Sequence, residues 1–447
     1  MGLKYIEPIK SIILLLLVLL SVTFTFSIWT YSPQLDTIEQ SPTVDISIGA
    51  SKQVEDIIKP YKFLIKYDES LNGTTEQEWI NHILREMDTW KVSQLVREPN
   101  EMNKGQMKAF FEQTNQFTLF FQGEVPLPLY DDILAIGDDQ LSRIPEFSFD
   151  RLVVRWNPKE IAFEAHFINR ATGIHYHGKI AASDTMTSYR QIVQEGENLP
   201  AYVEVNAQDS AYLAVPAEPV IMLRSTYFQE EISPTRFRDA LFNDPNAVRR
   251  SQVDATHEEF GDDHALLGVN TETKMLNFAH PAAYSGEPAA YPSDLLMDAI
   301  DSINEHGGWT DSYRFSYISP YYRSVKFQLY IHGYPVFSEP PLTGTTEIEL
   351  FYGENRVFRY IRPYYTIDVS LNDEEEELPS GMTIVNELME IENFDFGTVE
   401  EITTGYLMKH DPELRIYIME PIWFYFAKGD WIPYTPELGG GEQIGLE

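Results

Sequence analysis

Apolar and polar positions form several distinct patterns along the chain, and the strongest lies near its N-terminus. Ser11–Trp29 has the sequence SIILLLLVLLSVTFTFSIW, nineteen residues without a charge. A helix of roughly 20 apolar residues crosses the hydrocarbon core of a bilayer. A signal peptide instead has an apolar region of roughly 7–15 residues and then a cleavage site with small residues, and no such site follows Trp29. The pattern predicts an uncleaved transmembrane helix over residues 11–31.

The charges around this segment predict its orientation. Lys4 and Lys10 precede it, and the next cationic residue is Lys52. Because cationic flanks stay in the cytoplasm, we expect residues 1–10 to be cytoplasmic and the C-terminal region to be extracellular. Trp29 and Tyr31 would then lie at the outer membrane interface, where amphipathic aromatic side chains are enriched. The expected localisation is the cell membrane, crossed once.

The outer half of the apolar segment carries four hydroxyl side chains, Ser21, Thr23, Thr25 and Ser27. The first and third are four residues apart, as are the second and fourth, so each pair shares one face of a helix. In a membrane such hydroxyls bond either to their own helix or to a neighbouring helix. We interpret the four residues as candidate partner-binding residues, and bonding within the helix is the alternative.

After the apolar segment the sequence predicts a stalk over residues 32–49 and a first extracytoplasmic domain over 50–185. Thr75-Glu76-Gln77-Glu78 has the pattern of a capping box and precedes apolar residues at helical spacing. This spacing predicts an amphipathic helix. Strand patterns follow at 151–156 and 161–168.

A second domain is expected over residues 186–285, a third over 286–435 and a flexible tail over 436–447. The second domain mixes a short helix pattern at 234–242 with strand patterns. Residues 280–293 have no periodicity and contain three prolines, which marks the boundary to the third domain.

The third predicted domain repeats one pattern. A helix pattern at 292–303 is followed by two strand patterns, and a helix pattern at 379–391 is again followed by two. Between the copies lies a predicted hairpin that turns at Gly353-Glu354-Asn355. These elements predict an α+β fold with antiparallel sheets, and the β-α-β-α order of a dinucleotide-binding fold is absent.

Composition narrows the classes of protein that the chain can belong to. Aromatic residues make up 13% of it, which is typical of folded rather than disordered chains. The sequence has no cysteine, which excludes a disulfide scaffold, a thiol nucleophile and a Cys-ligated metal. The formal net charge is −36, so the surface repels nucleic acid and we expect no nucleic-acid partner.

The stretch GIHYHGKI, residues 173–180, comes closest to a motif that carries chemistry. It resembles a phosphate-binding loop, but Ile180 replaces the required hydroxyl and the stretch alternates like a strand. The alternation places His175, His177 and Lys179 on one face. Two histidines at this spacing can bind one metal ion, but the positive charge of Lys179 would repel a metal cation. We therefore interpret these residues as an exposed strand face.

Other charged stretches carry no complete motif. HEEFGDDH, residues 257–264, has Gly261 where the zinc-protease motif H-E-x-x-H requires its second histidine. We interpret this stretch as an acidic loop. NDEEEE, residues 372–377, lacks the pattern of a calcium loop and is interpreted as a solvated linker. Neither G-x-S-x-G nor S-x-x-K occurs. We predict no catalytic residue, no metal site and no cofactor, although a glycosidase-type pair of carboxylates stays open.

A single uncleaved N-terminal helix, a cysteine-free α+β exterior and four C-terminal stretches together resemble the YycH (WalH) family. The stretches are GYPVF (333–337), RYIRPYY (359–365), LPSGMTIVNEL (378–388) and MEPIWFYF (419–426). This family consists of accessory proteins of the WalK/WalR (YycG/YycF) two-component system of low-GC Gram-positive bacteria. The repeated C-terminal units also resemble the partner family YycI.

The resemblance implies a function without catalysis. YycH-like proteins assemble with YycI and the sensor histidine kinase WalK, restrain the kinase in several species, and so tune genes of cell-wall metabolism. The family is thought to act largely through its transmembrane helix. The expected partners are a WalK-type kinase, a YycI-like protein and the membrane, with a homodimer as an open alternative.

A second class of function stays open, namely a membrane-anchored cell-wall polymer-binding protein or hydrolase whose exterior does the work. The absence of nucleophile and metal motifs favours the regulator. The hydroxyl side chains of the predicted helix favour it as well. The sequence does not decide between restraint and activation of the kinase.

Overall fold

The contacts within the chain divide it into two units, residues 1–46 and 47–447. The structure is a computed structural model. It describes residues 14–21, 23, 47–131, 133–137, 143–207, 210–338, 342, 344–367 and 369–435. The side chains of residues 182–184 and the predicted tail 436–447 lie outside this description.

The described part of the first unit is helical, over residues 14–21 and at residue 23. Among all described residues, no helix combines the length and the apolar character that a membrane crossing needs. The other residues of the predicted span and the predicted stalk up to residue 46 lie outside the described residues. The transmembrane helix and the stalk therefore stay predictions.

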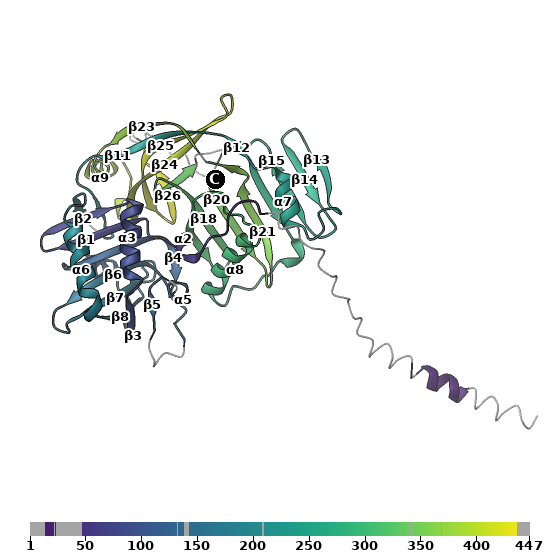
Figure 1. Cartoon of the computed structure of the whole chain (residues 1–447), viewed down its shortest axis with the longest axis horizontal. Helices are drawn as coiled ribbons and strands as arrows, with labels where there is room; N and C mark the ends of the chain where they lie inside the picture. The colour runs from purple at the N-terminus through teal and green to yellow at the C-terminus, as the bar shows by residue number, and fades with distance from the viewer. Residues whose placement is uncertain are drawn as a thin grey trace, which may run out of the picture. The chain divides into compact units, whose positions relative to one another are not determined.

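The second unit begins with an eight-stranded sheet in which only β3 and β5 pair in parallel (Figure 1). The strand patterns at 151–156 and 161–168 are confirmed as β6 and β7. In spatial order the strands are β2 (Ser70–Thr74), β1 (Lys62–Tyr67), β4 (Gln116–Pro126), β6 (Ser148–Asn157), β7 (Ala162–Ile168), β8 (His175–Ala181), β3 (Lys91–Arg97) and β5 (Ala135–Ile136).

Two helices, α3 (Gln77–Met87) and α6 (Ala182–Gly196), lie against one face of this sheet (Figure 1). The ring of Trp79 on α3 lies 4.3 Å from that of Phe63, measured between centroids. The helix confirms the amphipathic pattern, but the predicted capping box is wrong. The chain leaves β2 at Thr74, the N-cap is Glu76, and the Glu76 side chain makes no capping bond. The Glu76 N–H donates instead to the Thr74 hydroxyl.

The opposite face carries α4 (Lys104–Phe111), which begins with a capping box that the sequence analysis missed. The Gln106 N–H donates to Asn103 Oδ1 at 2.9 Å, and the Asn103 N–H donates to Gln106 Oε1 at 3.0 Å. Both bonds satisfy backbone donors that have no partner within the helix.

We expect Asn103→Ala to lower the free energy of unfolding by about 1 kcal/mol, because the substitution removes the N-cap acceptor. Urea unfolding followed by circular dichroism measures this loss. Gln113→Ala, an exposed change just beyond α4, is the control and should stay within about 0.5 kcal/mol of the unchanged protein. Equal loss in both variants would argue against the capping bond.

The second sheet has fourteen strands, and among its pairs only β19 and β24 run parallel. In spatial order the strands are β13 (Arg249–Gln252), β14 (His257–Gly261), β15 (Leu266–Asn270), β16 (Met275–Ala279), β21 (Val357–Pro363), β20 (Glu347–Tyr352), β18 (Ser324–Ile331), β19 (Tyr334–Ser338), β24 (Val399–Asp411), β25 (Ile416–Ala427), β11 (Val220–Phe228) and β23 (Ser370–Leu378), with β17 (Tyr313–Ser319) beside β18 and β26 (Asp430–Pro433) beside β25.

Smaller elements complete the second unit. Strand β11 belongs to the expected second domain and pairs with β23 and β25 of the expected third, and the domain boundaries stay predictions. The remaining elements are α2 (Val54–Ile57), α5 (Leu127–Tyr130), β9 (Tyr202–Glu204), β10 (Ala214–Pro216), β12 (Glu230–Glu231), α7 (Pro234–Leu241), η1 (Pro281–Ala283), α8 (Pro292–Asn304), β22 (Tyr365–Thr366), α9 (Gly381–Glu390) and η2 (Phe396–Thr398).

The predicted repeat is present in the second sheet. Helix α8 is followed by the antiparallel strands β17 and β18, and α9 is followed by the antiparallel strands β24 and β25. The predicted hairpin between the copies is formed by β20 and β21. At its turn a Cβ on Gly353 would lie 1.8 Å from the Ala283 carbonyl oxygen, so the close approach of the two loops requires glycine. The α+β fold with mostly antiparallel sheets is confirmed.

Two acidic stretches form strands, although the sequence analysis assigned neither to a strand. The expected linker 372–377 lies in β23, where Glu374 is opposite Arg224 of β11. Charged side chains are tolerated there because β23 is an edge strand and its carboxylates point into solvent. The expected loop 257–264 begins as β14. Both stretches form strands because their backbones pair with neighbouring strands. Backbone pairing does not require alternating apolar residues, so the sequence shows no strand pattern here.

Candidate functional site

The structure describes two of the four candidate partner-binding residues, Ser21 and Thr23. The Thr23 hydroxyl donates to the Leu19 carbonyl at 2.8 Å, which is the bond within the helix that the sequence left as the alternative. This bond uses the hydroxyl proton, whereas the lone pairs of the oxygen can still accept a bond from another helix. The other predicted site residues, Thr25, Ser27, Trp29 and Tyr31, lie outside the described residues, and their roles stay predictions.

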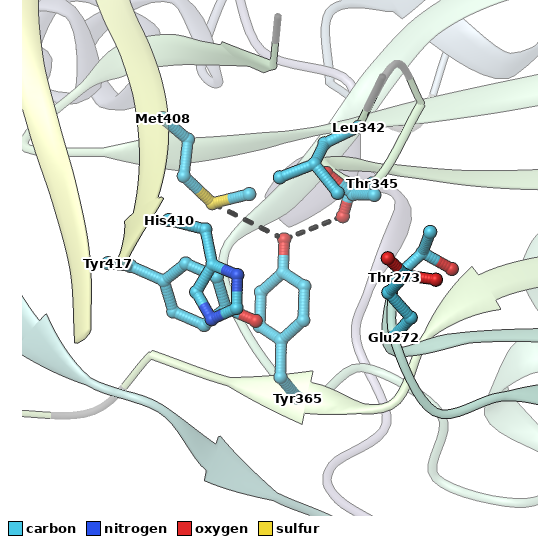
Figure 2. Close-up of a pocket in the computed structure, with 8 residues that line it drawn as sticks. All are labelled: Glu272, Thr273, Leu342, Thr345, Tyr365, Met408, His410 and Tyr417. Atoms are coloured by element: carbon cyan, nitrogen blue, oxygen red, sulfur yellow. Dashed lines mark hydrogen bonds between the residues drawn. The ribbon is translucent and has the colours of Figure 1, made fainter. Parts of the chain in front are cut away.

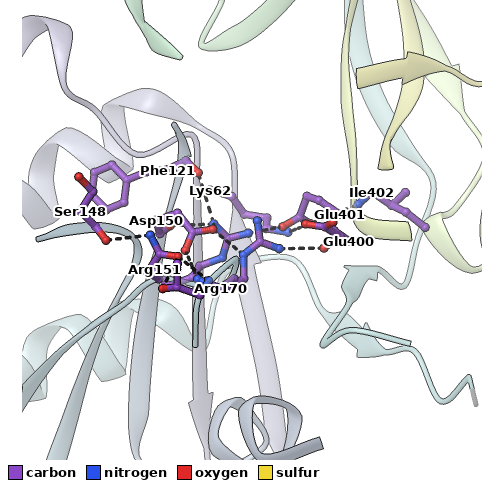
Figure 3. Close-up of polar contacts among 11 residues, drawn as sticks. Lys62, Phe121, Ser148, Asp150, Arg151, Arg170, Glu400, Glu401 and Ile402 are labelled. Atoms are coloured by element: carbon purple, nitrogen blue, oxygen red, sulfur yellow. Dashed lines mark hydrogen bonds and ion pairs between the residues drawn. The ribbon is translucent and has the colours of Figure 1, made fainter. Parts of the chain in front are cut away.

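A cluster of charged side chains lies where the two large sheets meet, and the sequence analysis missed it. We call Lys62, Asp150, Arg151, Arg170 and Glu401 the junction cluster (Figure 3). The Glu401 carboxylate of β24 accepts from Lys62 Nζ at 2.6 Å and from Arg151 Nη2 at 2.9 Å. These three residues are at most 2% exposed, so water does not screen their charges.

Strand register explains why two cations share one carboxylate. Lys62 is paired with Phe120, and Phe120 is paired with Arg151, across β1, β4 and β6. Paired residues point to the same face of a sheet. The Phe120 ring lies between the cations, 4.3 Å from Lys62 Nζ and 4.4 Å from the Arg151 guanidinium carbon. In β24 a bulge before Glu401 changes the direction of its side chain.

The second carboxylate of the junction cluster extends the network. Asp150 Oδ2 accepts from Arg170 Nε at 2.6 Å and from Arg151 Nη1 at 3.2 Å. Arg170 Nη1 in turn donates to the Glu400 carbonyl at 3.0 Å. The first sheet thus holds β24 through both the side chain of Glu401 and the backbone beside it.

Electrostatics keeps both carboxylates of the junction cluster ionised. Burial by itself raises the pKa of Glu401, but Lys62, Arg151 and Arg170 outweigh burial and hold that pKa below its ordinary value. Burial likewise opposes ionisation of Asp150, and the two arginines lower its pKa. The cluster is therefore a network of fixed charges that joins the two sheets. Lys62, Arg151 and Glu401 each stand beside a buried apolar residue of their strand, but other charged residues occur in the same strands, so the sequence carries no specific signal for the cluster.

Histidines from two neighbouring strands form a second polar cluster. His175 and His177 of β8 share a face with His166 of β7, which is paired with His177. His166 Nδ1 lies 2.9 Å from His175 Nε2. The prediction of an exposed strand face is wrong for His175, which is 6% exposed, because Phe110 of α4 packs its ring 5.4 Å away, between centroids.

Burial and nearby charges shift the pKa values in this histidine cluster. Burial lowers the pKa of His166 to about 4 and that of His175 to about 3, so both are neutral at neutral pH. The contact with His166, whose Nε2 lies 3.3 Å from Glu164 Oε2, lowers the pKa of Glu164 to about 2. Among the described residues, no group of three or more histidines and carboxylates is arranged to hold a metal ion.

A small space between β22 and the strands β24 and β25 is filled by its own side chains (Figure 2). The Tyr365 hydroxyl donates to the Thr345 carbonyl at 2.6 Å and contacts Met408 Sδ at 3.5 Å. The ring of His410 lies against that of Tyr417, with centroids 4.9 Å apart. The remaining space is too small for a water molecule, so this is packed core.

Two protein-family models together match most of the chain. The model described as "YycH protein, N-terminal domain" matches residues 7–198, and that described as "YycH protein, C-terminal domain" matches residues 210–438. The chain belongs to the YycH family. Glu401 falls within the C-terminal family domain and the other members of the junction cluster within the N-terminal one, so the cluster joins the two domains of this family.

One curated protein and one solved structure are similar to the chain over most of its length. A Bacillus subtilis (strain 168) protein named "Two-component system WalR/WalK regulatory protein YycH" is 20% identical over 452 residues, which cover 97% of each chain. The solved structure titled "Crystal Structure of YycH from Bacillus subtilis" matches with a TM-score of 0.71 and 18% identity. It covers 87% of this chain and 98% of that one, and it supports the fold.

Proposed function

We propose that this YycH-family protein is a membrane-anchored, non-catalytic regulator of a WalK-type sensor histidine kinase. In this proposal it restrains the kinase together with a YycI-like partner and so controls genes of cell-wall metabolism. The observation that carries the proposal is the similarity, over 97% of both chains, to a protein named as a WalR/WalK regulatory protein.

Regulation of this kind requires a difference in binding free energy. The accessory helix shifts the kinase only if it packs better against one signalling state than against the other. The Thr23 hydroxyl already donates to Leu19 within its own helix, so it could take part in such a contact only as an acceptor. We assign the contact to the two helix faces that carry these hydroxyls, one with Ser21 and Thr25 and the other with Thr23 and Ser27.

The helix contact predicts the effect of removing all four hydroxyls by Ser21→Ala, Thr23→Val, Thr25→Val and Ser27→Ala. Expression of kinase-controlled genes should rise to the level of a strain that lacks this protein, because the restraint is lost. A transcriptional reporter measures this change, and immunoblotting checks that the variant accumulates normally.

A variant that keeps the hydroxyls is the matched control for this experiment. Ser21→Thr, Thr23→Ser, Thr25→Ser and Ser27→Thr retain each hydroxyl while changing its methyl group, and regulation should persist. Unchanged expression in the variant without hydroxyls, at normal protein level, would refute the helix contact. Restoration of regulation by the first 35 residues alone would show that the exterior is not the effector.

A further inference from the structure

The first residues of the second unit, residues 47–52, lie against the segment that follows α8. We call residues 47–52 the strap. The Ile48 N–H donates to the His306 carbonyl at 3.0 Å. Ala50 and Trp309 form an isolated antiparallel bridge, in which the N–H of each donates to the carbonyl of the other at 3.3 Å. The strap is therefore held mainly by its backbone.

One side chain, that of Asn304 at the end of α8, fixes the far end of the strap. The Lys52 N–H donates to Asn304 Oδ1 at 2.9 Å, and Asn304 Nδ2 donates to the Lys52 carbonyl at 3.0 Å. The same Oδ1 accepts from Trp309 Nε1 at 2.8 Å. Asn304 thus holds the strap and the buried Trp309 side chain together.

The strap crosses the boundary between the two domains of the family. By sequence it falls within the N-terminal domain, which matches residues 7–198, whereas Asn304 and Trp309 fall within the C-terminal domain, which matches residues 210–438. The first unit ends at residue 46. The strap therefore fastens the N-terminal segment of the chain to the C-terminal domain.

The strap has little buried surface to hold it closed. Ile48 is 6% exposed, and the other strap residues are half-buried or exposed. A segment with few buried apolar contacts and exposed backbone bonds opens at a lower free energy than the core does. In α2, which begins directly after Gln53, Val54 and Ile57 are at most 8% exposed. Opening would therefore stop at Gln53.

We propose that the strap is a releasable coupling between the N-terminal segment and the C-terminal domain. In its open state the strap leaves Asn304 and Trp309, while α2 stays packed. Opening frees six residues, which span at most roughly 20 Å when extended, so it lengthens the tether between the proposed anchor and the exterior. The coupling goes beyond the proposed kinase regulation, because it does not depend on what the anchor contacts.

Hydrogen exchange of the purified full-length chain in detergent, followed by mass spectrometry, tests the coupling. Amides of the strap report on its opening, and amides of β17 report on opening of the core. We expect the strap amides to exchange at least about tenfold more slowly than in a free peptide, and at least about a hundredfold faster than those of β17.

Variants on both sides of the contact locate the protection. An added Cβ on Gly49 would lie 2.8 Å from the Trp309 carbonyl oxygen, so Gly49→Ala prevents closure without changing the C-terminal domain. Both Gly49→Ala and Asn304→Ala should lower the protection of the strap amides about tenfold and leave β17 unchanged. Gln53→Ala is the matched control, since Gln53 is exposed and its side chain makes no capping bond. It should change the protection less than about twofold.

Three results would overturn the proposal. They are strap amides as protected as those of β17, strap amides without protection in the unchanged chain, and equal protection in Gly49→Ala and the unchanged chain. Misfolding cannot be mistaken for opening of the strap, because β17 reports on the fold in the same sample. The kinase proposal would survive all three, because no kinase takes part in the exchange.

Discussion

Replacing Glu401 by alanine is expected to lower the free energy of unfolding by about 3–5 kcal/mol, the loss typical when one partner of a buried ion pair is removed. The substitution leaves Lys62 and Arg151 buried without their shared anion. Water cannot reach either cation, since both are at most 2% exposed. Urea unfolding at pH 7.5, followed by tryptophan fluorescence, measures this loss.

The neighbouring glutamate supplies the matched control for this prediction. Glu400 contacts Arg170 through its backbone carbonyl, which Glu400→Ala retains. This variant should stay within about 0.5 kcal/mol of the unchanged protein. Similar losses in the two variants would show that the junction cluster contributes no specific stabilisation.

A third variant separates the charge effect from the packing effect. Lys62→Met, Arg151→Met and Glu401→Leu together remove both cations and the carboxylate that pairs them. Apolar side chains of similar size can replace a buried ionic network at little cost, although Asp150 then retains only Arg170 as a cationic partner. We therefore expect the triple variant to be more stable than Glu401→Ala.

The junction cluster joins the two domains of the YycH family. The two domains of the YycH family contribute separately to it, with Glu401 on one side and four residues on the other. Hydrogen exchange should accordingly become faster in β1, β6 and β24 of the Glu401→Ala variant, because the contact between the sheets loosens.

Local patterns predicted the elements of this fold well. The helix–strand–strand repeat and the hairpin at Gly353 follow from periodicity and turn residues within short windows, and both are present. Strand β23 escaped prediction because its five consecutive acidic residues carry no apolar alternation. Only its pairing with β11, which lies about 150 positions earlier in the sequence, makes it a strand.

The polar clusters were beyond prediction because sequence spacing does not encode them. Lys62 and Glu401 are 339 positions apart, and the register of two separate sheets brings them together. His166 meets His175 because Asn169 and Gly173 form the turn between β7 and β8. The Asn169 side chain accepts from the Thr172 N–H at 2.9 Å, and Gly173 has a φ of +75°, which favours glycine. The sequence analysis identified His175 as a candidate but did not identify His166.

The histidine cluster predicts an acid-sensitive fold. In the unfolded chain His166 and His175 have a pKa of 6.5, whereas burial lowers it to about 4 and about 3 in the folded chain. The unfolded chain therefore binds more protons below pH 6.5, and stability falls as pH decreases through this range. For His166 alone, the loss amounts to roughly 3 kcal/mol by pH 4.

The groups that face these histidines do not cancel this effect. Electrostatic repulsion from Arg155 and His177 opposes protonation of His166. Glu164 favours it, but the pKa of Glu164 is already lowered to about 2, so its charge does not change between pH 6.5 and pH 4.5. The two buried histidines should therefore dominate the loss of stability in this interval.

Unfolding at steps between pH 7.5 and 4.5 measures the predicted slope. The double variant His166→Gln, His175→Gln has lost both titrating groups, so its stability should vary much less with pH than that of the unchanged protein. The control His264→Gln changes an exposed histidine and should keep the full slope. A double variant with the same slope as the unchanged protein would mean that α4 does not exclude water from the pair, because the low pKa values require burial beneath Phe110.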